Sequence, residues 1–216
     1  MRGKFITFEG IDGSGKSTQL RMLADVLRSR SVDLVLTREP GGTRLGRRLR
    51  EAFLETEDAV APLAEMLLFA ADRAQHVELL IKPALEAGRT VISDRYADAT
   101  TAYQGAGRGF STDTIKQITE LATGGLKPDL SLFFDAEVAA AIARSSNRHD
   151  ADGTRNRMDL ETVDFYTRVR EAYLKIAAEE PKRFRTVDAN GSIHETHDNV
   201  IAIVCELLGI AARAEV

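Results

Sequence analysis

A glycine-rich segment near the N-terminus carries the residue types that bind phosphate groups. Residues 10–18 read Gly-Ile-Asp-Gly-Ser-Gly-Lys-Ser-Thr and fit the pattern G-x-x-x-x-G-K-[ST]. Glycines at these positions let the backbone turn tightly and point successive N–H groups at an anion. Lys16 would contact the β- and γ-phosphates of a nucleotide, and the Ser17 hydroxyl would ligate Mg²⁺. The nucleotide-contacting residues predicted from this pattern are Gly10, Ile11, Asp12, Gly13, Ser14, Gly15, Lys16, Ser17 and Thr18.

The loop could bind phosphate or could be a glycine-rich turn that binds nothing, and the segments on either side of it distinguish the two interpretations. Residues 4–8 form a short β-branched and aromatic run that is typical of a strand. Residues 17–30 place Leu20, Leu23 and Leu27 at helical spacing. A strand before the loop and a helix after it favour phosphate binding, because the helix contributes its positive N-terminal end.

Charged residues also follow two other predicted strands. Arg38 and Glu39 follow the strand expected at residues 32–37, and Asp94 follows the apolar strand expected at residues 90–93. Asp94 could hold a Mg²⁺ ion or could simply cap a turn. Its neighbour Arg95 favours the metal site, because a second anion-binding group beside the metal suits a phosphate acceptor. Ligands of parallel sheets bind beyond the carboxyl ends of the strands, where all these residues would lie.

Four arginines gather in the segment that runs from residue 144 to residue 157. They are Arg144, Arg148, Arg155 and Arg157. Residues 145–158 are rich in Ser, Asn, Asp and Gly, and we expect them to form a mobile lid. Mobile arginines can neutralise a phosphoryl group during its transfer. The alternative is a solvated, charged loop without a role in chemistry.

Phe69 and Arg73 lie four residues apart within the helix expected at residues 64–82. An aromatic plane beside a guanidinium group could hold a flat, hydrogen-bonding base. The alternative places Phe69 in the core and Arg73 on the surface.

The order of predicted elements indicates one α/β domain that spans residues 1–216. Strands are expected at 4–8, 32–37, 90–93, 129–135 and 184–187. Helices are expected at 17–30, 45–54, 64–82, 111–122, 136–145 and 160–179, and a last helix opens with a capping box at Ser192 and Glu195. Residues 104–110 are expected to form a glycine-rich bend. Because several strands are apolar on both faces, we predict a five-stranded parallel sheet flanked by helices on both faces.

Composition limits the classes of partner. The chain has 216 residues, of which 44% are hydrophobic and 29% are charged, as in an ordinary globular protein. A net charge of −4 and a pI of about 5.7 argue against a nucleic-acid-binding surface. The single cysteine, Cys205, cannot form an internal disulfide and indicates a reduced, cytoplasmic setting. The absence of a long apolar run or secretory segment argues against a membrane partner.

Several motifs together resemble the bacterial thymidylate kinases. They are the loop at 9–18, Arg-Glu-Pro-Gly-Gly-Thr at 38–43, Asp-Arg-Tyr at 94–96, Ala-Tyr-Gln-Gly at 102–105, Gly-Arg-Gly at 107–109 and Lys-Pro-Asp-Leu at 127–130. The resemblance extends over nearly the whole chain. It implies transfer of the γ-phosphoryl group of ATP to dTMP, giving ADP and dTDP, with Mg²⁺ as cofactor. It also implies a homodimer formed through helices beside the sheet.

The resemblance further implies a role for each candidate residue on the donor side. Lys16 would contact the ATP phosphates, Ser17 and Asp94 would hold Mg²⁺, and Arg144 would flank adenine. The candidates for contacting the transferring phosphoryl group are Arg95, Arg148, Arg155 and Arg157. Some family members carry an arginine in the phosphate loop where this chain has Gly13, so the lid would supply the missing charge. The family usually shows Asp-Arg-Phe/Ile-Glu at the end of the lid, where this chain has Asn-Arg-Met-Asp at 156–159.

On the acceptor side, the resemblance assigns the parts of dTMP to separate groups. For the phosphate these are Arg38 and Arg95, with Glu39 nearby. For the sugar they are Asp12, which would accept from the 3′-OH, and Tyr103, which would lie where a ribose 2′-OH would clash. For thymine they are Phe69, which would stack, Arg73, which would donate to a carbonyl, and Thr100 and Gln104 at the remaining edge. Arg50 is a further substrate candidate.

Two other functions remain as alternatives. A kinase of the same fold could act on another nucleoside or nucleotide, and the base pocket would distinguish the two. A nucleotide-dependent switch protein is the other alternative, but the sequence lacks the Asn-Lys-x-Asp motif that reads guanine. The acceptor-side arginines would also have no role in a simple switch.

Overall fold

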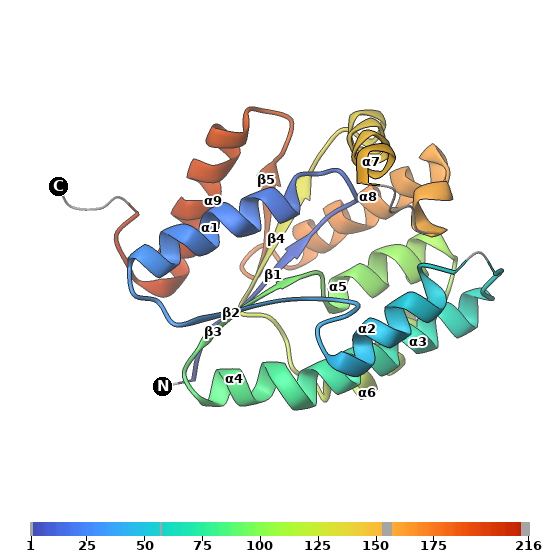
Figure 1. The fold of residues 1–216 in the computed structure, drawn as a ribbon, viewed down its shortest axis with the longest axis horizontal. Helices are drawn as coiled ribbons and strands as arrows, with labels where there is room; N and C mark the ends of the chain where they lie inside the picture. The colour runs from blue at the N-terminus through green and yellow to red at the C-terminus, as the bar shows by residue number, and fades with distance from the viewer. Residues whose placement is uncertain (1, 57, 153–156, 213–216) are drawn as a thin grey trace.

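The protein is an α/β domain built on a five-stranded parallel sheet, as seen in a computed structural model (Figure 1). The structure describes residues 2–56, 58–152 and 157–212, with the backbone alone for residues 148–152. The strands are β1 (Phe5–Glu9), β2 (Leu34–Arg38), β3 (Thr90–Asp94), β4 (Leu130–Asp135) and β5 (Phe184–Asp188). Their order in the sheet is β2-β3-β1-β4-β5, and every pair is parallel. The predicted fold class is therefore confirmed.

Helices connect each strand to the next. The α-helices are α1 (Lys16–Ser29), α2 (Arg44–Phe53), α3 (Pro62–His76), α4 (Lys82–Glu86), α5 (Ala97–Thr100), α6 (Thr112–Thr123), α7 (Val138–Asp152), α8 (Val163–Glu179) and α9 (Ile193–Leu208). Short π-helical turns η1 (Val77–Ile81) and η2 (Thr101–Gly107) and a 3₁₀ turn η3 (Arg157–Leu160) lie between them. The predicted capping box is present, since Ser192 and Glu195 exchange hydrogen bonds at the start of α9. No helix among the described residues has the length and apolar character needed to span a membrane.

Both faces of the sheet are covered by helices. Helices α1 and α9 cover one face, where Phe8 of β1 packs in a cluster with Leu23 and Val204 (Figure 1). On the other face, η1 and α4 cover Phe5, while α8 covers the β4–β5 side. There the rings of Phe133 and Tyr173 stack with centroids 5.0 Å apart. Neighbouring residues of each strand therefore contribute to different cores, as expected for a sheet buried on both sides.

Three elements differ from the sequence-based expectation. The long helix expected at 64–82 is divided into α3, η1 and α4, because Pro83 lacks the N–H that the helical ladder requires at that point. The bend expected at 104–110 is π-helical as far as Gly107. Helix α7 continues to Asp152, so residues 145–152 are helical and the expectation of a loop there is wrong.

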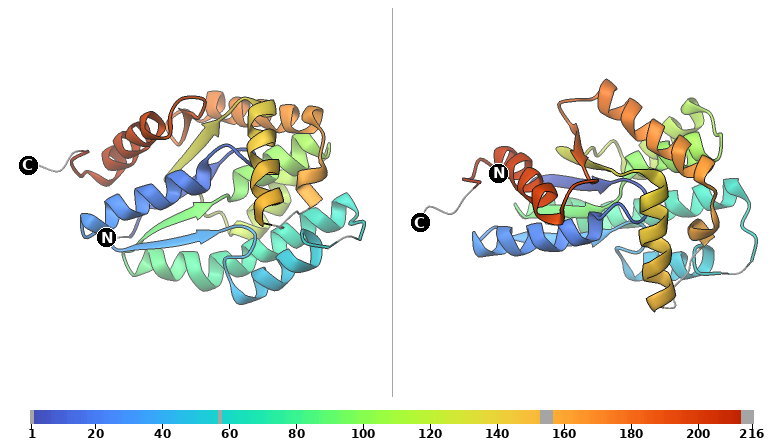
Figure 2. Two further views of the ribbon diagram at one scale, coloured as in Figure 1. Left: turned by 45° about the horizontal axis from the view of Figure 1, so that its top comes forward. Right: turned by 90° about the horizontal axis from the view of Figure 1, so that it is seen from above.

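Helix α7 begins and continues for local reasons. The Glu137 carboxylate accepts hydrogen bonds from the N–H groups of Ala139 and Ala140, at 3.0 and 2.7 Å, and so caps the first turn. Residues 138–152 contain no glycine or proline, so nothing in the sequence ends the helix at 145. Figure 2 shows α7 at the end of the sheet toward which the strand arrows point. The helix therefore borders the edge at which ligands of parallel sheets bind.

Candidate active site

The phosphate loop joins β1 to α1 with the backbone that its glycines allow. Gly10, Gly13 and Gly15 have φ values of 136°, 78° and 93°, in the region that favours glycine. The buried Lys16 ammonium donates to the carbonyl oxygens of Gly10 and Ile11, at 2.9 and 2.8 Å. Burial and then the nearby Arg95 charge lower the pKa of Lys16 to about 8. The loop therefore concentrates backbone N–H groups and an ammonium group in a small volume.

A pair of oxygen ligands lies beside the loop. The Ser17 hydroxyl donates to Asp94 Oδ2 at 3.0 Å, so α1 and the end of β3 meet at this point. Both side chains line a cavity together with Lys16, Arg38 and Arg95. Among the described residues no group of three or more His, Cys, Asp or Glu side chains could hold a metal alone. One hydroxyl and one carboxylate fit Mg²⁺, which usually completes its shell with waters and phosphate oxygens.

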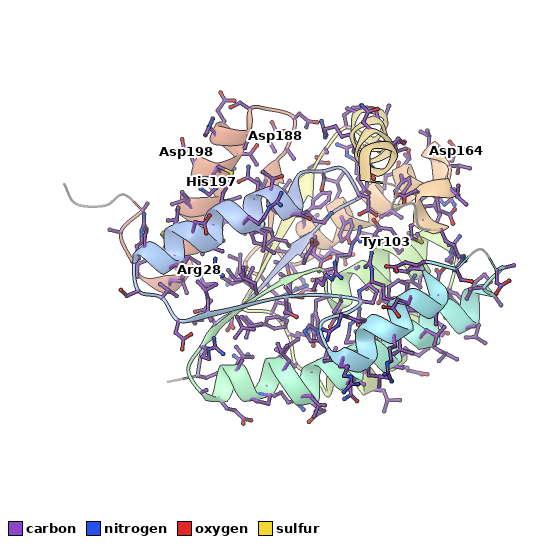
Figure 3. The ribbon with its side chains drawn as sticks, in the orientation of Figure 1. Arg28, Tyr103, Asp164, Asp188, His197 and Asp198 are labelled. Carbon is purple, nitrogen blue, oxygen red and sulfur yellow. The ribbon has the colours of Figure 1, made fainter. Side chains whose placement is uncertain are left out.

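A second cavity adjoins the first and collects the residues predicted to bind the acceptor, except Arg38, which lines the first cavity. Its lining includes Asp12, Glu39, Arg50, Phe69, Arg73, Arg95, Thr100, Tyr103 and Gln104. The two cavities share Asp12, Glu39, Arg50 and Arg95, so they meet at these residues. The side chain of Tyr103 lies among the helices at the carboxyl ends of the strands (Figure 3). Residues from five segments of the chain thus converge on one hollow with a phosphate loop at its edge.

Arg95 occupies the junction of the two cavities in a constrained conformation. Its φ of 72° is unusual for a residue with a side chain, and Arg95 N donates to Phe8 O at 2.9 Å. The guanidinium contacts Asp12 at 3.1 Å and the Tyr103 hydroxyl at 2.9 Å. Burial alone would lower the pKa of Arg95, but Asp12 and then Tyr103 raise it well above its usual value. Arg95 Nε is buried without a hydrogen-bond partner among the described residues. An oxygen of a bound anion could accept a hydrogen bond from it.

Arg73 is held rigidly inside the second cavity. Its Nε donates to Glu39 at 2.8 Å, and its two terminal nitrogens donate to Thr100 Oγ1 at 2.7 Å and to Tyr96 O at 3.0 Å. His76 contacts the other oxygen of Glu39 at 2.8 Å. Both charged side chains of the Glu39–Arg73 pair are only 2% exposed. The alternative in which Arg73 lies on the surface is therefore wrong.

Comparison with known proteins decides the family. The family model described as thymidylate kinase matches residues 8–200. The thymidylate kinase of Desulfovibrio desulfuricans is 50% identical over 190 residues, covering 86% of this chain and 88% of that protein. The thymidylate kinase of Nitratidesulfovibrio vulgaris strain Miyazaki F is 46% identical over 213 residues, covering 97% and 99%. The chain belongs to the thymidylate kinase family.

A solved structure agrees with this assignment. The crystal structure of thymidylate kinase from Ehrlichia chaffeensis superposes with a TM-score of 0.77 at 34% sequence identity. The match covers 94% of this chain and 99% of that chain. The order of elements described above is therefore shared with a member of the family.

The structure separates the arginines of the predicted lid. Arg144 Nε donates to Gly13 O at 2.8 Å, so it lies beside the phosphate loop. Arg157 instead donates to Phe53 O at 2.8 Å and to Val60 O at 3.4 Å, and the structure does not bring it to the phosphate loop. Arg155 and the side chain of Arg148 lie outside the described part of the chain.

The packing of α7 explains the glycine at position 13. A Cβ atom on Gly13 would lie 1.9 Å from Ala141 O, and the φ of 78° would strain any other residue. An arginine at this position, as in some thymidylate kinases, is incompatible with α7 in its present place. Among the described side chains, Arg144 of α7 is an arginine that lies beside Gly13.

Sequence reasoning missed three buried polar residues around the site. Glu65 and His76 lie on the inner side of α3, and Glu9 ends β1 directly before the phosphate loop. A signal existed for the first two. Glu65, Phe69, Asp72, Arg73 and His76 recur at helical spacing, so they form one face of α3 with unusually many charges. Such a face is expected to line a site and not a purely apolar core.

Glu9 connects β1 to the turn that carries Arg95. Its Oε1 accepts from Tyr96 N at 2.9 Å, and its Oε2 accepts from the Tyr173 hydroxyl at 3.0 Å. Burial, and next the charge of Asp98, raise the pKa of Glu9 to about 8. Its burial in the core therefore favours the protonated form of this carboxyl group more than in a free glutamate.

This pKa shift predicts a pH-dependent stability difference. Folding raises the pKa of Glu9 from 4.5 to about 8, so its contribution to the free energy of unfolding falls as pH rises between these values. Glu9→Gln cannot ionise, so between pH 5 and pH 8 the wild type should lose on the order of 3 kcal/mol of unfolding free energy relative to this variant. Chemical denaturation at both pH values measures this difference. The control is Glu120→Gln on the exposed side of α6, and a stability difference for Glu9→Gln that is constant with pH would contradict the prediction.

Proposed function

We propose that this enzyme transfers the γ-phosphoryl group of ATP to the phosphate of dTMP where the two cavities meet. As a thymidylate kinase, it phosphorylates dTMP to dTDP, and the family uses ATP. The observation that carries the proposed geometry is the sharing of Asp12, Arg50 and Arg95 by the phosphate-loop cavity and the acceptor cavity. ATP in the first cavity and dTMP in the second would have their phosphate groups facing each other.

On the donor side, the phosphate loop would bind the triphosphate. The N–H groups of residues 10–18 and the N-terminus of α1 would surround the phosphates, while Lys16 would exchange its carbonyl partners for phosphate oxygens. Ser17 and Asp94 would hold Mg²⁺, which neutralises phosphate charge when it is bound. Arg144, on α7 beside Gly13, would flank the adenine.

On the acceptor side, two arginines would bind the phosphate of dTMP. Arg38 lines the phosphate-loop cavity, and Arg95 has a buried Nε available for a phosphate oxygen. Glu39 and Arg50 lie at the same junction. Asp12 would accept from the 3′-OH of the deoxyribose.

The remaining acceptor residues would bind the sugar and the base. Tyr103, fixed by its hydrogen bond with Arg95, would lie under the sugar and leave no room for a 2′-OH. Phe69 would stack on thymine, and Arg73 would donate to a thymine carbonyl. Thr100 and Gln104 would contact the rest of the base edge.

The transfer itself needs positioning and charge neutralisation. A phosphate monoester oxygen is already nucleophilic at neutral pH, so no general base is required. Lys16 and Arg95 would hold the two polyanions in line and reduce their repulsion. A lid formed by residues 145–158 would exclude water and bring Arg148 and Arg155 near the phosphates. Arg157, bonded to two backbone carbonyl groups, is better suited to fixing the end of this lid than to contacting the phosphoryl group.

A homodimer would use the outer side of α3. Leu63 and Leu67 lie one turn apart on this helix and are 52% and 50% exposed, and Leu79 of η1 is 66% exposed. Exposed leucines grouped on one segment are typical of a surface covered by a partner. We infer that a second copy of the chain covers this side, as the likeness to bacterial thymidylate kinases implies.

Substitution of the charged groups at the junction tests the transfer geometry. We expect Lys16→Ala and Arg95→Ala to lower kcat/KM for dTMP by at least about 100-fold, because each removes charge that stabilises the transition state. Coupled ADP-release assays measure the loss, and circular dichroism checks the fold. Arg89→Ala is the matched control, since Arg89 pairs with Asp33 at the amino ends of β2 and β3. Wild-type turnover in Arg95→Ala would refute the proposed geometry.

Substitution of the two oxygen ligands tests the magnesium site. Ser17→Ala and Asp94→Asn should each raise the Mg²⁺ concentration that gives half-maximal rate by about tenfold, because each removes one ligand or its charge. Magnesium titrations at saturating ATP and dTMP measure this value. Asp25→Asn, an exposed carboxylate on α1, should leave it unchanged. An unchanged requirement in both site variants would exclude this pair as the metal site.

The oligomeric state tests the surface proposed for the partner. We expect the wild-type enzyme to have the mass of a dimer, and Leu67→Arg to shift it toward the monomer, because a charge would be buried against the partner. Size-exclusion chromatography with light scattering measures both masses. Leu160→Arg, at a residue that is 75% exposed in η3, is the control. A monomeric wild-type enzyme at micromolar concentration would be inconsistent with the proposal.

A further inference from the structure

Glu65 is a fully buried carboxylate on α3 that is not itself among the residues lining either cavity. Its Oε1 accepts from Gln104 Nε2 at 3.1 Å. Arg108 donates to both oxygens, each at 3.2 Å, and Arg157 lies 3.4 Å from Oε2. A carboxylate paired with an arginine in this two-point geometry accepts hydrogen bonds and donates none. Its neighbour Gln104 must therefore turn its amide nitrogen toward α3.

This contact fixes which atom of Gln104 remains for a ligand. The oxygen and nitrogen of a side-chain amide have nearly the same shape, so only hydrogen-bond partners decide which way the group is turned. Gln104 lines the acceptor cavity beside Arg73 and Thr100. With the nitrogen engaged by Glu65, the amide oxygen is the atom left to accept a hydrogen bond in the cavity.

An acceptor at this position discriminates between pyrimidines. Thymine and uracil carry a hydrogen on ring nitrogen N3, whereas the N3 of cytosine is itself an acceptor. We propose that Glu65 is a positioning residue for base selection, which holds the Gln104 amide so that its oxygen accepts from N3–H and disfavours cytosine. This inference rests on the proposed binding of the base against Gln104. Two acceptors facing each other in a buried site would leave both unpaired, which is costly.

The other contacts of Glu65 allow its roles to be separated. Arg108 has a second carboxylate partner, Glu161, at 2.6 Å, and its guanidinium lies 5.0 Å from the centre of the Phe165 ring. Loss of Glu161 would disturb the same arginine without touching the contact between Glu65 and Gln104. Glu161 therefore provides a matched control for a purely structural effect.

The test compares dTMP with dCMP in the variant Glu65→Gln. A glutamine at 65 can pair with Gln104 in either orientation, so the amide would no longer be fixed. We expect the ratio of kcat/KM for dTMP to that for dCMP to fall by about tenfold, mainly through a higher KM for dTMP. Glu161→Gln should leave this ratio at the wild-type value. Equal losses for both nucleotides in Glu65→Gln would overturn the inference.

Two further variants keep the result interpretable. If Glu65→Gln fails to fold by circular dichroism, the double variant Glu65→Gln/Arg108→Met removes the arginine charge with the carboxylate, and the same fall in the ratio is expected. Gln104→Ala tests the underlying placement of the base and should raise the KM for dTMP. No change in Gln104→Ala would refute that placement and the inference together. The remaining outcome is a raised KM for dTMP in Gln104→Ala together with an unchanged dTMP-to-dCMP ratio in Glu65→Gln. That outcome would refute only the inference about Glu65. If Glu65→Gln does not fold, the ratio in the double variant is used instead.

Discussion

The buried ion pair between Glu39 and Arg73 is the interaction on which the acceptor side depends. It joins the loop after β2 to α3, and Arg73 extends the connection to Thr100 and Tyr96 after β3. His76 completes it by bonding the second oxygen of Glu39. Loss of one partner would leave a charge unpaired in the interior, which typically costs about 3–5 kcal/mol. The pair therefore holds the ends of β2 and β3 against α3 and also presents fixed donors to a ligand.

The sequence predicted the parts of the molecule that depend on local chemistry. The glycines of the phosphate loop, the apolar strands and the capping box of α9 each act through neighbouring residues, and the structure has them where they were expected. The resemblance to the family then predicted many of the side chains that line the acceptor cavity. Residues 145–152 were misjudged because their polar composition resembles a loop, although they contain neither glycine nor proline and continue α7.

The missed residues share a different cause. Glu65 bonds Gln104 and Arg157, which lie 39 and 92 positions away in the sequence. Glu9 bonds Tyr96 and Tyr173 at separations of 87 and 164 positions. A buried carboxylate is stable only with partners that tertiary structure supplies, and a single sequence does not show those partners. The charged face of α3 indicated that such partners exist but not which residues they are.

The contact of α7 with Gly13 couples the orientation of this helix to the backbone of the phosphate loop. Ala141 and Arg144 rest on the phosphate loop, whereas the helix ends at Asp152. At 1.5 Å per residue the part of α7 beyond Ala141 is roughly 16 Å long, so a 20° tilt of the helix would move its end by roughly 6 Å and would separate Ser145 from Asp159, which it bonds at 3.4 Å. A small change in the backbone angles of Gly13 would thus produce a larger displacement at the C-terminal end of α7, without a hinge inside the helix.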